Sequence, residues 1–217
     1  MSLFYSKSKN LDLRYLSNFE KSKVSYKGKS YPSVESGFQG LKYFISGCKE
    51  VASKFELGGK YENLDSSEIK KLGGKGGFKK NKCELDVDKW NKESVGIMRK
   101  LLESRYDNDI RFKTILDGLN VKLFHFERSG VKSFWGGNWE KNDIIRNKET
   151  FRGQNKLGEL LDGLKDVVEV DENVKEDEEE DGGWGKWEEV DEDEEEDSDY
   201  DYQYKPVQYK PVQTSNK

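Results

Sequence analysis

The feature that most limits how this chain can fold is an abrupt change of composition at Asp171. Residues 171–217 hold 19 Asp and Glu against 5 Lys and Arg, and they end in a duplicated Y-K-P-V-Q motif. A segment this acidic and this poor in apolar residues cannot bury enough surface to offset the entropy lost when it is ordered. We therefore expect a disordered acidic tail over residues 171–217 and a single folded domain over residues 1–170.

The two parts of the chain carry opposite charge. The tail has a net charge of −14 and the whole chain −5, which leaves +9 for residues 1–170. A basic domain suits a polyanionic partner such as nucleic acid, because phosphate contacts dominate that binding, although a solvated lysine-rich surface is a common alternative. For the tail we predict nucleic-acid mimicry, in which it folds back over the domain. A protein partner anchored by Trp184 and Trp187 and a plain solubility tail are the alternatives.

The sequence shows no sign of export or of membrane insertion. Its first residues lack a charged region followed by an apolar stretch, and no apolar run approaches the length of a membrane span. Cys48 and Cys83 are the only cysteines, and no Cys/His cluster has metal-binding spacing. We therefore expect reduced thiols in an intracellular protein, cytoplasmic or nuclear, that uses neither a metal nor a cofactor. The single histidine, His125, argues against a histidine-based catalytic triad.

Periodicity and turn residues predict a helix-rich α+β domain with a few short strands. Strands are expected at residues 3–5 and 121–126, and a hairpin at 24–31. Helices are expected from residue 34 onward, at 48–57, from 65 to the glycines at 73–74, and at 90–106, 109–116 and 155–168. The run G-G-K-G-G-F-K-K-N-K at residues 73–82 could cradle phosphate through backbone N–H groups and lysines, or form a mobile basic loop.

The run S-Y-P-S-V-E-S-G-F-Q-G-L-K-Y-F at residues 30–44 organises the domain. Pro32 favours an extended entry, and Ser33 is placed to cap a helix that begins at Val34. One face of that helix carries four residues at i, i+3, i+4 and i+7: Glu35, Phe38, Gln39 and Lys42. The neighbouring apolar stripe would face the core: Val34, Phe38, Leu41 and Ile45. By itself this pattern favours a solvated polar face on an ordinary amphipathic helix.

Five segments together resemble the NADAR (YbiA-like) family. They are L-F-Y-S at 3–6, L-S-N-F at 16–19, Y-P-S-V-E-S-G-F-Q-G-L-K-Y at 31–43, S-F-W-G-G at 133–137 and G-Q-N-K-L-G-E-L-L at 153–161. They occur in family order and span roughly the first three quarters of the chain. The resemblance implies hydrolysis of an N-glycosidic bond. The family's substrates are ribosylamino intermediates of riboflavin synthesis and ADP-ribose attached to guanine in nucleic acid, so an ADP-ribose-containing or phosphoribosyl substrate is expected here.

The resemblance also assigns roles to individual residues. Glu35 matches the family's helix glutamate and takes the carboxylate role that an oxocarbenium-like transition state requires. Lys42 matches the lysine of F-Q-x-x-K; it could bind phosphate or attack the anomeric carbon as an amine, and phosphate binding is favoured because the sequence shows no desolvation. The substrate-binding candidates are Ser17, Asn18, Phe19, Phe38, Gln39, Trp135, Gly136 and Asn155.

Several of these candidates have a plainer interpretation. Phe38 could simply belong to the core, and Gln39 could be solvated. Trp135 would stack on a purine or flavin-like ring, with Gly136 allowing the backbone to approach the ligand. Asn155 could bind phosphate at the start of the last helix or act as an ordinary N-cap.

Three departures from the family pattern bear on catalysis. Many members have a histidine where this chain has Ser36, an aspartate at the position of Lys132, and an acidic residue near the position of His125. Either Glu127 or Glu140 replaces the missing aspartate, or the substrate is more anionic, or the domain binds without cutting. The alternative function is therefore a catalytically degenerate module that binds ADP-ribose or a nucleotide and recruits partners through its acidic tail.

Overall fold

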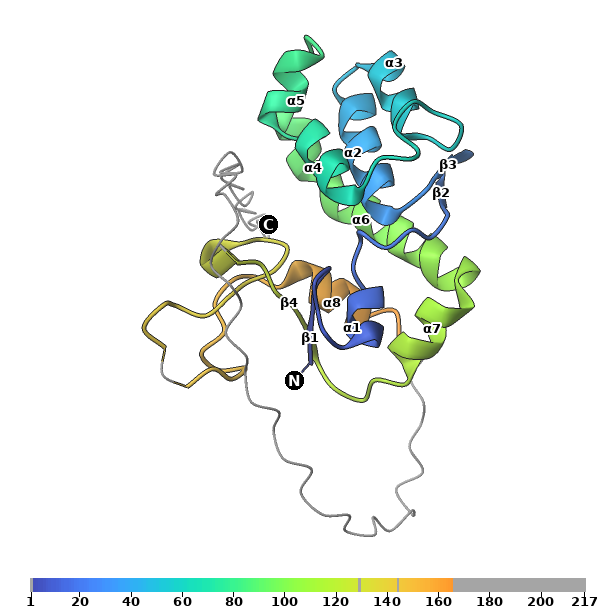
Figure 1. The fold of residues 1–217 in the computed structure, drawn as a ribbon. Coiled ribbons are helices and arrows are strands. Elements are labelled where there is room, and N and C mark those ends of the chain that lie inside the picture. The colour runs from blue at the N-terminus through green and yellow to red at the C-terminus, as the bar shows by residue number, and fades with distance from the viewer. Residues whose placement is uncertain (1, 129, 144, 166–217) are drawn as a thin grey trace, which may run out of the picture.

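A computed structural model describes residues 2–128, 130–143 and 145–165 (Figure 1). The predicted tail, its two tryptophans and its duplicated motif lie outside these residues. Within them the fold is rich in helices, with two small two-stranded sheets, which confirms the predicted α+β class. None of the helices within these ranges is both long enough and apolar enough to cross a membrane.

The helices and strands are distributed along the whole described chain. The strands are β1 (Ser2–Phe4), β2 (Val24–Tyr26), β3 (Lys29–Tyr31) and β4 (Leu123–His125). The α-helices are α1 (Leu11–Tyr15), α2 (Val34–Ile45), α3 (Lys49–Ala52), α4 (Ser66–Leu72), α5 (Lys75–Lys80), α6 (Val87–Asn108), α7 (Ile110–Asp117) and α8 (Lys156–Asp162). Two 3₁₀ turns, η1 (Ser53–Phe55) and η2 (Gly130–Lys132), complete the set.

The two sheets connect segments at very different sequence distances. Strand β1 pairs in parallel with β4, with Phe4 opposite His125, so the start of the chain lies beside its middle. Strands β2 and β3 form the predicted hairpin, with Val24 opposite Tyr31. Its two turn residues, Lys27 and Gly28, both have positive φ (48° and 79°), as a tight hairpin that follows the strand twist requires.

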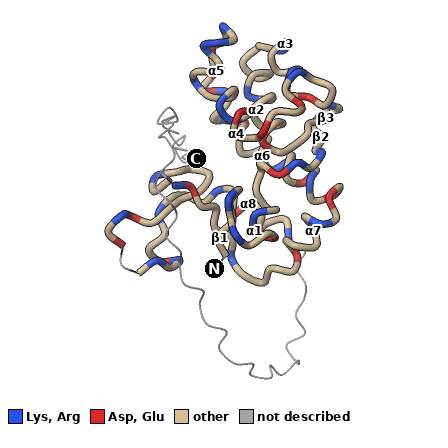
Figure 2. The backbone as a smooth tube through the Cα atoms, viewed as in Figure 1, with Lys and Arg blue, Asp and Glu red and all other residues tan. Residues whose placement is uncertain are grey.

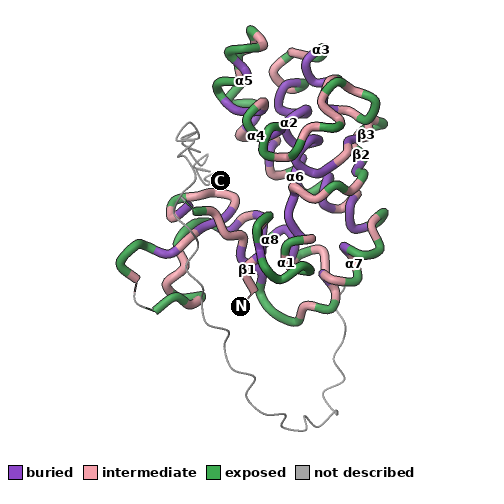
Figure 3. The backbone as a smooth tube through the Cα atoms, in the orientation of Figure 1, coloured by how far each residue is buried: buried purple, intermediate pink, exposed green. Residues whose placement is uncertain are grey.

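Helix α2 lies at the centre of the upper part of the molecule and is buried along most of its length (Figure 3). It packs against the long helix α6, and Gly37 makes this close approach feasible: a Cβ there would lie 2.8 Å from Cδ2 of Leu101. A second apolar cluster joins α2 to α5, where the rings of Tyr43 and Phe78 stack with centroids 4.0 Å apart. Helices on both sides therefore fix the position of α2.

Local signals located several helix ends correctly. The side chain of Ser33 accepts a hydrogen bond from the backbone N–H of Ser36, as expected of the cap of α2. Asp65 and Glu68 form a capping box at the start of α4, and α4 begins and ends where the helix from residue 65 to the glycines at 73–74 was predicted. Caps involve residues only two or three positions apart, which is why the sequence alone indicates them.

Other boundaries differ from the prediction. Most of residues 73–82 forms helix α5 and not a loop, because Phe78 is buried against α2. The helix expected at 48–57 is divided into α3 and η1. The last helix ends at Asp162, with Gly163 as its C-cap, and does not extend toward residue 168 within the described chain.

The two cysteines are joined to each other. Cys48, directly after α2, and Cys83, shortly after α5, form a disulfide with their Cα atoms 6.4 Å apart. The expectation of two reduced thiols is therefore wrong for this structure. The sequence could not reveal the pairing, because 35 positions separate the two residues and only the packing of α5 against α2 brings them together.

Candidate active site

The polar face of α2 is buried. Glu35, Gln39 and Lys42 are only 6%, 4% and 5% exposed, respectively. The end of α4 covers this face, where the Nζ atom of Lys42 donates a hydrogen bond to the carbonyl oxygen of Gly73 at 3.1 Å. The interpretation of this face as solvated is therefore wrong, and its three polar groups lie together in a low-dielectric environment.

Glu35 is held at both its backbone and its side chain. Its backbone N–H donates to the carbonyl oxygen of Asn18 at 3.1 Å, and its Oε1 atom accepts from Nε2 of Gln39 at 2.8 Å. Burial raises the pKa of this carboxyl above its ordinary value, while the positive charges of Lys70 and Lys42 and the hydrogen bond from Gln39 oppose the rise. Burial therefore favours the neutral form of this carboxyl more than in an exposed glutamate.

Lys42 is an amine enclosed by aromatic rings. Its Nζ lies 5.3 Å from the ring centroid of Trp90 and 5.9 Å from that of Phe38. Burial lowers the pKa of Lys42 to about 8, with Glu35 opposing the fall. Near pH 7 roughly a tenth of such a group is the neutral amine, so it can serve either as a cation or as a nucleophile.

Two buried amide oxygens next to Glu35 have no hydrogen-bond donor among the described residues: Oδ1 of Asn18 and Oε1 of Gln39. The Asn18 Nδ2 atom has only a 3.5 Å contact to Sδ of Met98. Buried polar atoms are seldom left unpaired, so these two call for a donor that the described part of the chain does not supply. Hydroxyl groups of a sugar would be suitable donors.

The loop at residues 16–19 forms one edge of this site. Ser17 is buried, and its Oγ accepts from the backbone N–H of Phe19 at 3.2 Å, while Phe19 itself is half-buried. The loop is therefore fixed by its own hydrogen bonds as well as by the contact between Asn18 and Glu35. It lies beside Glu35, and its role in binding substrate stays a prediction.

The S-F-W-G-G segment reaches the same place from the other half of the chain. The half-buried Trp135 meets Phe38 edge to face, with ring centroids 5.3 Å apart. Gly136 is needed for internal packing: a Cβ on it would lie 2.5 Å from the carbonyl oxygen of His125. Phe38 belongs to the core and also contacts Trp135, so a core role is compatible with a place at the site.

Asn155 serves the internal structure. Its Oδ1 accepts from the backbone N–H of His125 and its Nδ2 donates to the carbonyl of Leu123, each at 2.8 Å. Asn155 is the N-cap residue of α8 by position, but it has a left-handed backbone, with φ of 51°, and its side chain makes no capping hydrogen bond. The amide instead fixes β4 against the start of α8.

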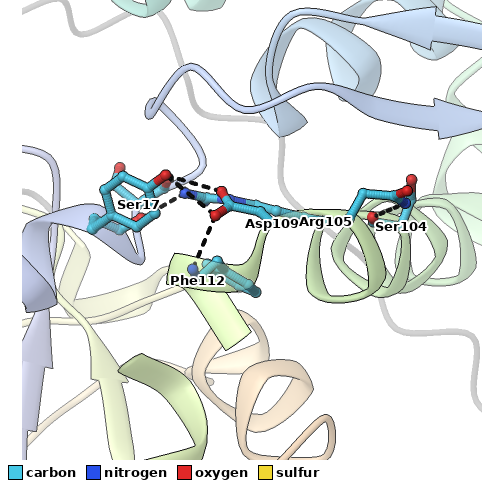
Figure 4. A network of polar contacts seen from close by, with 7 residues as sticks. Ser17, Ser104, Arg105, Asp109 and Phe112 are labelled. Atoms are coloured by element: carbon cyan, nitrogen blue, oxygen red, sulfur yellow. Dashed lines mark hydrogen bonds and ion pairs between the residues drawn. The ribbon is translucent and has the colours of Figure 1, made fainter. Parts of the chain in front are cut away.

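Arg105, which the sequence analysis missed, fixes the 16–19 loop (Figure 4). It is fully buried; its Nη1 donates to the carbonyl of Ser17 at 2.9 Å and its Nη2 to that of Tyr15 at 2.7 Å. Asp109 provides the counter-charge, with Oδ2 3.5 Å from Nε, and the ring of Phe112 lies 4.2 Å from the guanidinium. A charged residue in a helical repeat is normally assigned to the solvent face, so periodicity gave no signal for this role.

Three further residues at the site were also missed or given no function. Trp90 was assigned only to a core helix, and Lys70 and Ser133 were not singled out. Lys70, on α4, acts electrostatically on both Glu35 and His125. No local pattern marks Trp90 or Lys70, because they reach α2 only through the packing of separate helices, whereas Ser133 begins the S-F-W-G-G motif.

The comparison with protein families decides the relationship. A model of the NADAR domain matches residues 3–169. The chain belongs to the NADAR family. The NMR structure of the E. coli protein YbiA is similar, with a TM-score of 0.50 and 20% sequence identity over 74% of this chain and 79% of YbiA, which shows a shared fold. No curated protein matches the sequence.

The departures from the NADAR pattern have clear structural settings. Ser36 is buried and belongs to the cap of α2, where its Oγ accepts a 3.1 Å hydrogen bond from Ser33. Lys132 is exposed on η2. Glu140 is exposed in a turn with Asp143, whose Oδ2 accepts from the Glu140 backbone N–H at 3.1 Å. Neither Ser36 nor Lys132 therefore supplies a carboxylate next to Glu35.

Proposed function

We propose that this NADAR domain hydrolyses an N-glycosidic bond, with Glu35 and Lys42 as its catalytic residues. The observation that carries the proposal is the buried polar face of α2, on which a carboxyl with a raised pKa and an amine with a lowered pKa lie within electrostatic reach of each other. Burying two ionisable groups costs free energy, so a purely structural role does not explain them well. Family membership supports a glycosidase type of reaction.

The chemistry follows from the two groups. In the direct route, the ionised Glu35 stabilises the positive charge that develops on the sugar as the bond to the base breaks and water attacks. In the covalent route, the neutral amine of Lys42 attacks the anomeric carbon, the base leaves with the electron pair of the C–N bond, and water later releases the sugar. The unpaired oxygens of Asn18 and Gln39 would accept hydrogen bonds from sugar hydroxyls.

For the substrate we propose ADP-ribose attached to a nucleobase, with a phosphoribosylamino metabolite of the riboflavin type as the alternative within the enzyme class. Trp135 would contact the base. The nucleic-acid version is supported by the α4–α5 lysine cluster, which we define as the exposed residues Lys71, Lys75, Lys79, Lys80 and Lys82. Basic residues recur along α5 in Figure 2, and α5 is fixed next to the Lys42 side of α2.

The proposal is tested by measuring release of free ADP-ribose from a guanine-ADP-ribosylated oligonucleotide, with the Glu35→Gln variant alongside. Release by the wild type alone supports the proposal. A small ribosylamino substrate is measured in parallel, with and without competing duplex DNA. Turnover of the metabolite that is indifferent to DNA would reject the nucleic-acid version and retain the glycosidase.

Replacing Lys71, Lys75, Lys79 and Lys80 by glutamine is expected to weaken binding of a single-stranded oligonucleotide at least tenfold in low salt. The slope of log K against log salt should fall by about 0.7 for each phosphate that the variant no longer neutralises. The measurement is fluorescence anisotropy across a salt series. The matched control replaces the exposed Lys7, Lys9, Lys141 and Lys148, which removes the same charge from segments far from α5 in Figure 1. Equal weakening in both variants would show that only net charge matters.

The pH dependence of turnover should separate the two roles of Lys42. If the amine attacks, kcat rises with pH and levels off above about 8, because deprotonation through the lowered pKa supplies the nucleophile. The sequence favoured phosphate binding because it shows no desolvation, and burial removes that reason. If Lys42 instead binds phosphate as a cation, KM increases above about pH 8, while kcat does not change with deprotonation of the amine. A pH series of kcat and KM for the wild type and Lys42→Met distinguishes these outcomes.

A degenerate binding module remains the second candidate, favoured by the exposed Lys132 at the position of the family's aspartate. Binding of ADP-ribose without turnover of either substrate would select it.

We also propose that residues 1–170 form the working domain and that residues 171–217 weaken non-specific binding or recruit a protein partner. Truncation after Val170 should then tighten DNA binding at low salt. An intracellular location stays a prediction, and the Cys48–Cys83 disulfide is more typical of an oxidising compartment.

A further inference from the structure

The segment that follows β4 is fixed on both sides of Glu127. The backbone N–H of Glu127 donates to the carbonyl of Gly137 at 2.9 Å, and the N–H of Gly137 donates to the carbonyl of His125 at 2.9 Å. The carbonyl of Glu127 accepts in turn from the N–H of Gly130 at 2.9 Å. Both main-chain groups of Glu127 are therefore hydrogen-bonded, which fixes the point from which its side chain extends.

A relay of hydrogen bonds sets the direction of the Glu127 side chain. The Oγ of Ser133 donates to Oε2 of Glu127 and accepts from the N–H of Gly136 at 3.0 Å. A Cβ on Gly136 would lie 3.1 Å from Cγ of Glu127 and 2.9 Å from Nδ1 of His125. The side-chain stem of Glu127 and the imidazole of His125 thus both lie against Gly136. None of the described hydrogen bonds engages Oε1 of Glu127, and Nδ1 of His125 is buried without a partner among the described residues.

This pair lies near the proposed catalytic residues. Trp135, next to Gly136, contacts Phe38 on the same helical face as Glu35. The negative charge of Glu127 raises the pKa of Glu35 and also that of His125, so it lies within electrostatic reach of both. Lys70 acts on the same two groups from α4 with the opposite sign, while burial and not charge is the main cause of the lowered pKa of His125.

We propose that Glu127 is the second carboxylate of the site, taking the place that Lys132 vacates, with Ser133 as its positioning residue. This inference rests on the proposed function. In the hydrolytic step, Glu127 accepts a proton from water as the water oxygen bonds to the anomeric carbon and the base leaves with the electron pair of the C–N bond. Glu140, the other candidate, lies exposed in the 140–143 turn and has no contact with this cluster among the described residues.

The first test is turnover. The Glu127→Gln variant is expected to lower kcat at least 100-fold, with KM changed by less than about threefold, because the proton acceptor is removed but the substrate contacts stay. Ser133→Ala should lower kcat about tenfold, since Glu127 loses its anchor but keeps its charge. Glu140→Gln should stay within about twofold of the wild type. Equal turnover of the Glu127 and Glu140 variants would overturn the proposal.

The second test needs no turnover, because His125 is the only histidine in the chain and its imidazole signals in a proton NMR titration are unambiguous. Removing the charge of Glu127 should lower the titration midpoint of His125 by at least half a pH unit, whereas Glu140→Gln should leave it unchanged. An unchanged midpoint in Glu127→Gln would overturn the placement of Glu127 even if the domain is an active glycosidase. A lowered midpoint in a protein that turns over nothing would refute the proposed function and the catalytic role together, while confirming the placement.

Discussion

Replacing Glu35 by glutamine is expected to lower kcat/KM by about 10³-fold, the largest effect of any single change at the site. Glutamine has the same shape and keeps an oxygen that can accept the hydrogen bond from Gln39, so the fold of α2 should be unaffected. It removes the charge and the exchangeable proton, which are what an oxocarbenium-like transition state uses. The measurement is initial rates over a substrate series for the two proteins.

The control for this variant is Glu50→Gln. Glu50 also stands in the first turn of a helix, α3, but it is exposed. Its replacement should leave turnover within about twofold of the wild type. A melting temperature of Glu35→Gln equal to or above that of the wild type would confirm that the loss is chemical, because a buried carboxyl with a raised pKa costs stability when ionised. Full activity of Glu35→Gln would reject the assignment of Glu35.

Replacing Arg105 by methionine is expected to lower the free energy of unfolding by about 3–5 kcal/mol, a large part of what holds a domain of this size together. Methionine fills much of the volume but leaves the carbonyl of Tyr15 without its donor and Asp109 without its counter-charge. The carbonyl of Ser17 keeps only the backbone N–H of Glu20 as a donor. Buried polar groups that lose their partners bear the full cost of desolvation. Urea denaturation followed by fluorescence measures the difference.

Arg111→Met is the matched control, because Arg111 also lies over the ring of Tyr15, with its Cζ 4.2 Å from the centroid. Its ion pair with Asp12 is exposed on both sides, and such pairs contribute about 0–1 kcal/mol. A similar small decrease for both arginines would contradict the buried network in Figure 4 as a main source of stability. Since Arg105 also orders the loop that holds Glu35, folded Arg105→Met should bind substrate more weakly.

What the sequence by itself determined is local. The cap of α2 at Ser33, the helix that begins after Asp65 and the hairpin over residues 24–31 each depend on residues within a few positions of one another, and all three were predicted correctly. The helix-rich α+β class followed from periodicity. The likeness to the NADAR family was also visible in the sequence, because five motifs in order are specific even where each alone is weak.

What only the tertiary structure decided is burial. The pattern of α2 suggested a solvated polar face, and it is the end of α4, more than 20 positions away, that covers Lys42. The same holds for Arg105 beneath the 16–19 loop and for the hydrogen bond from Ser133 to Glu127, on which the proposed role of Glu127 rests. The ionisation of a carboxyl or an amine depends on desolvation and on charges brought close by packing. Those quantities come from contacts between distant segments, which no local pattern encodes.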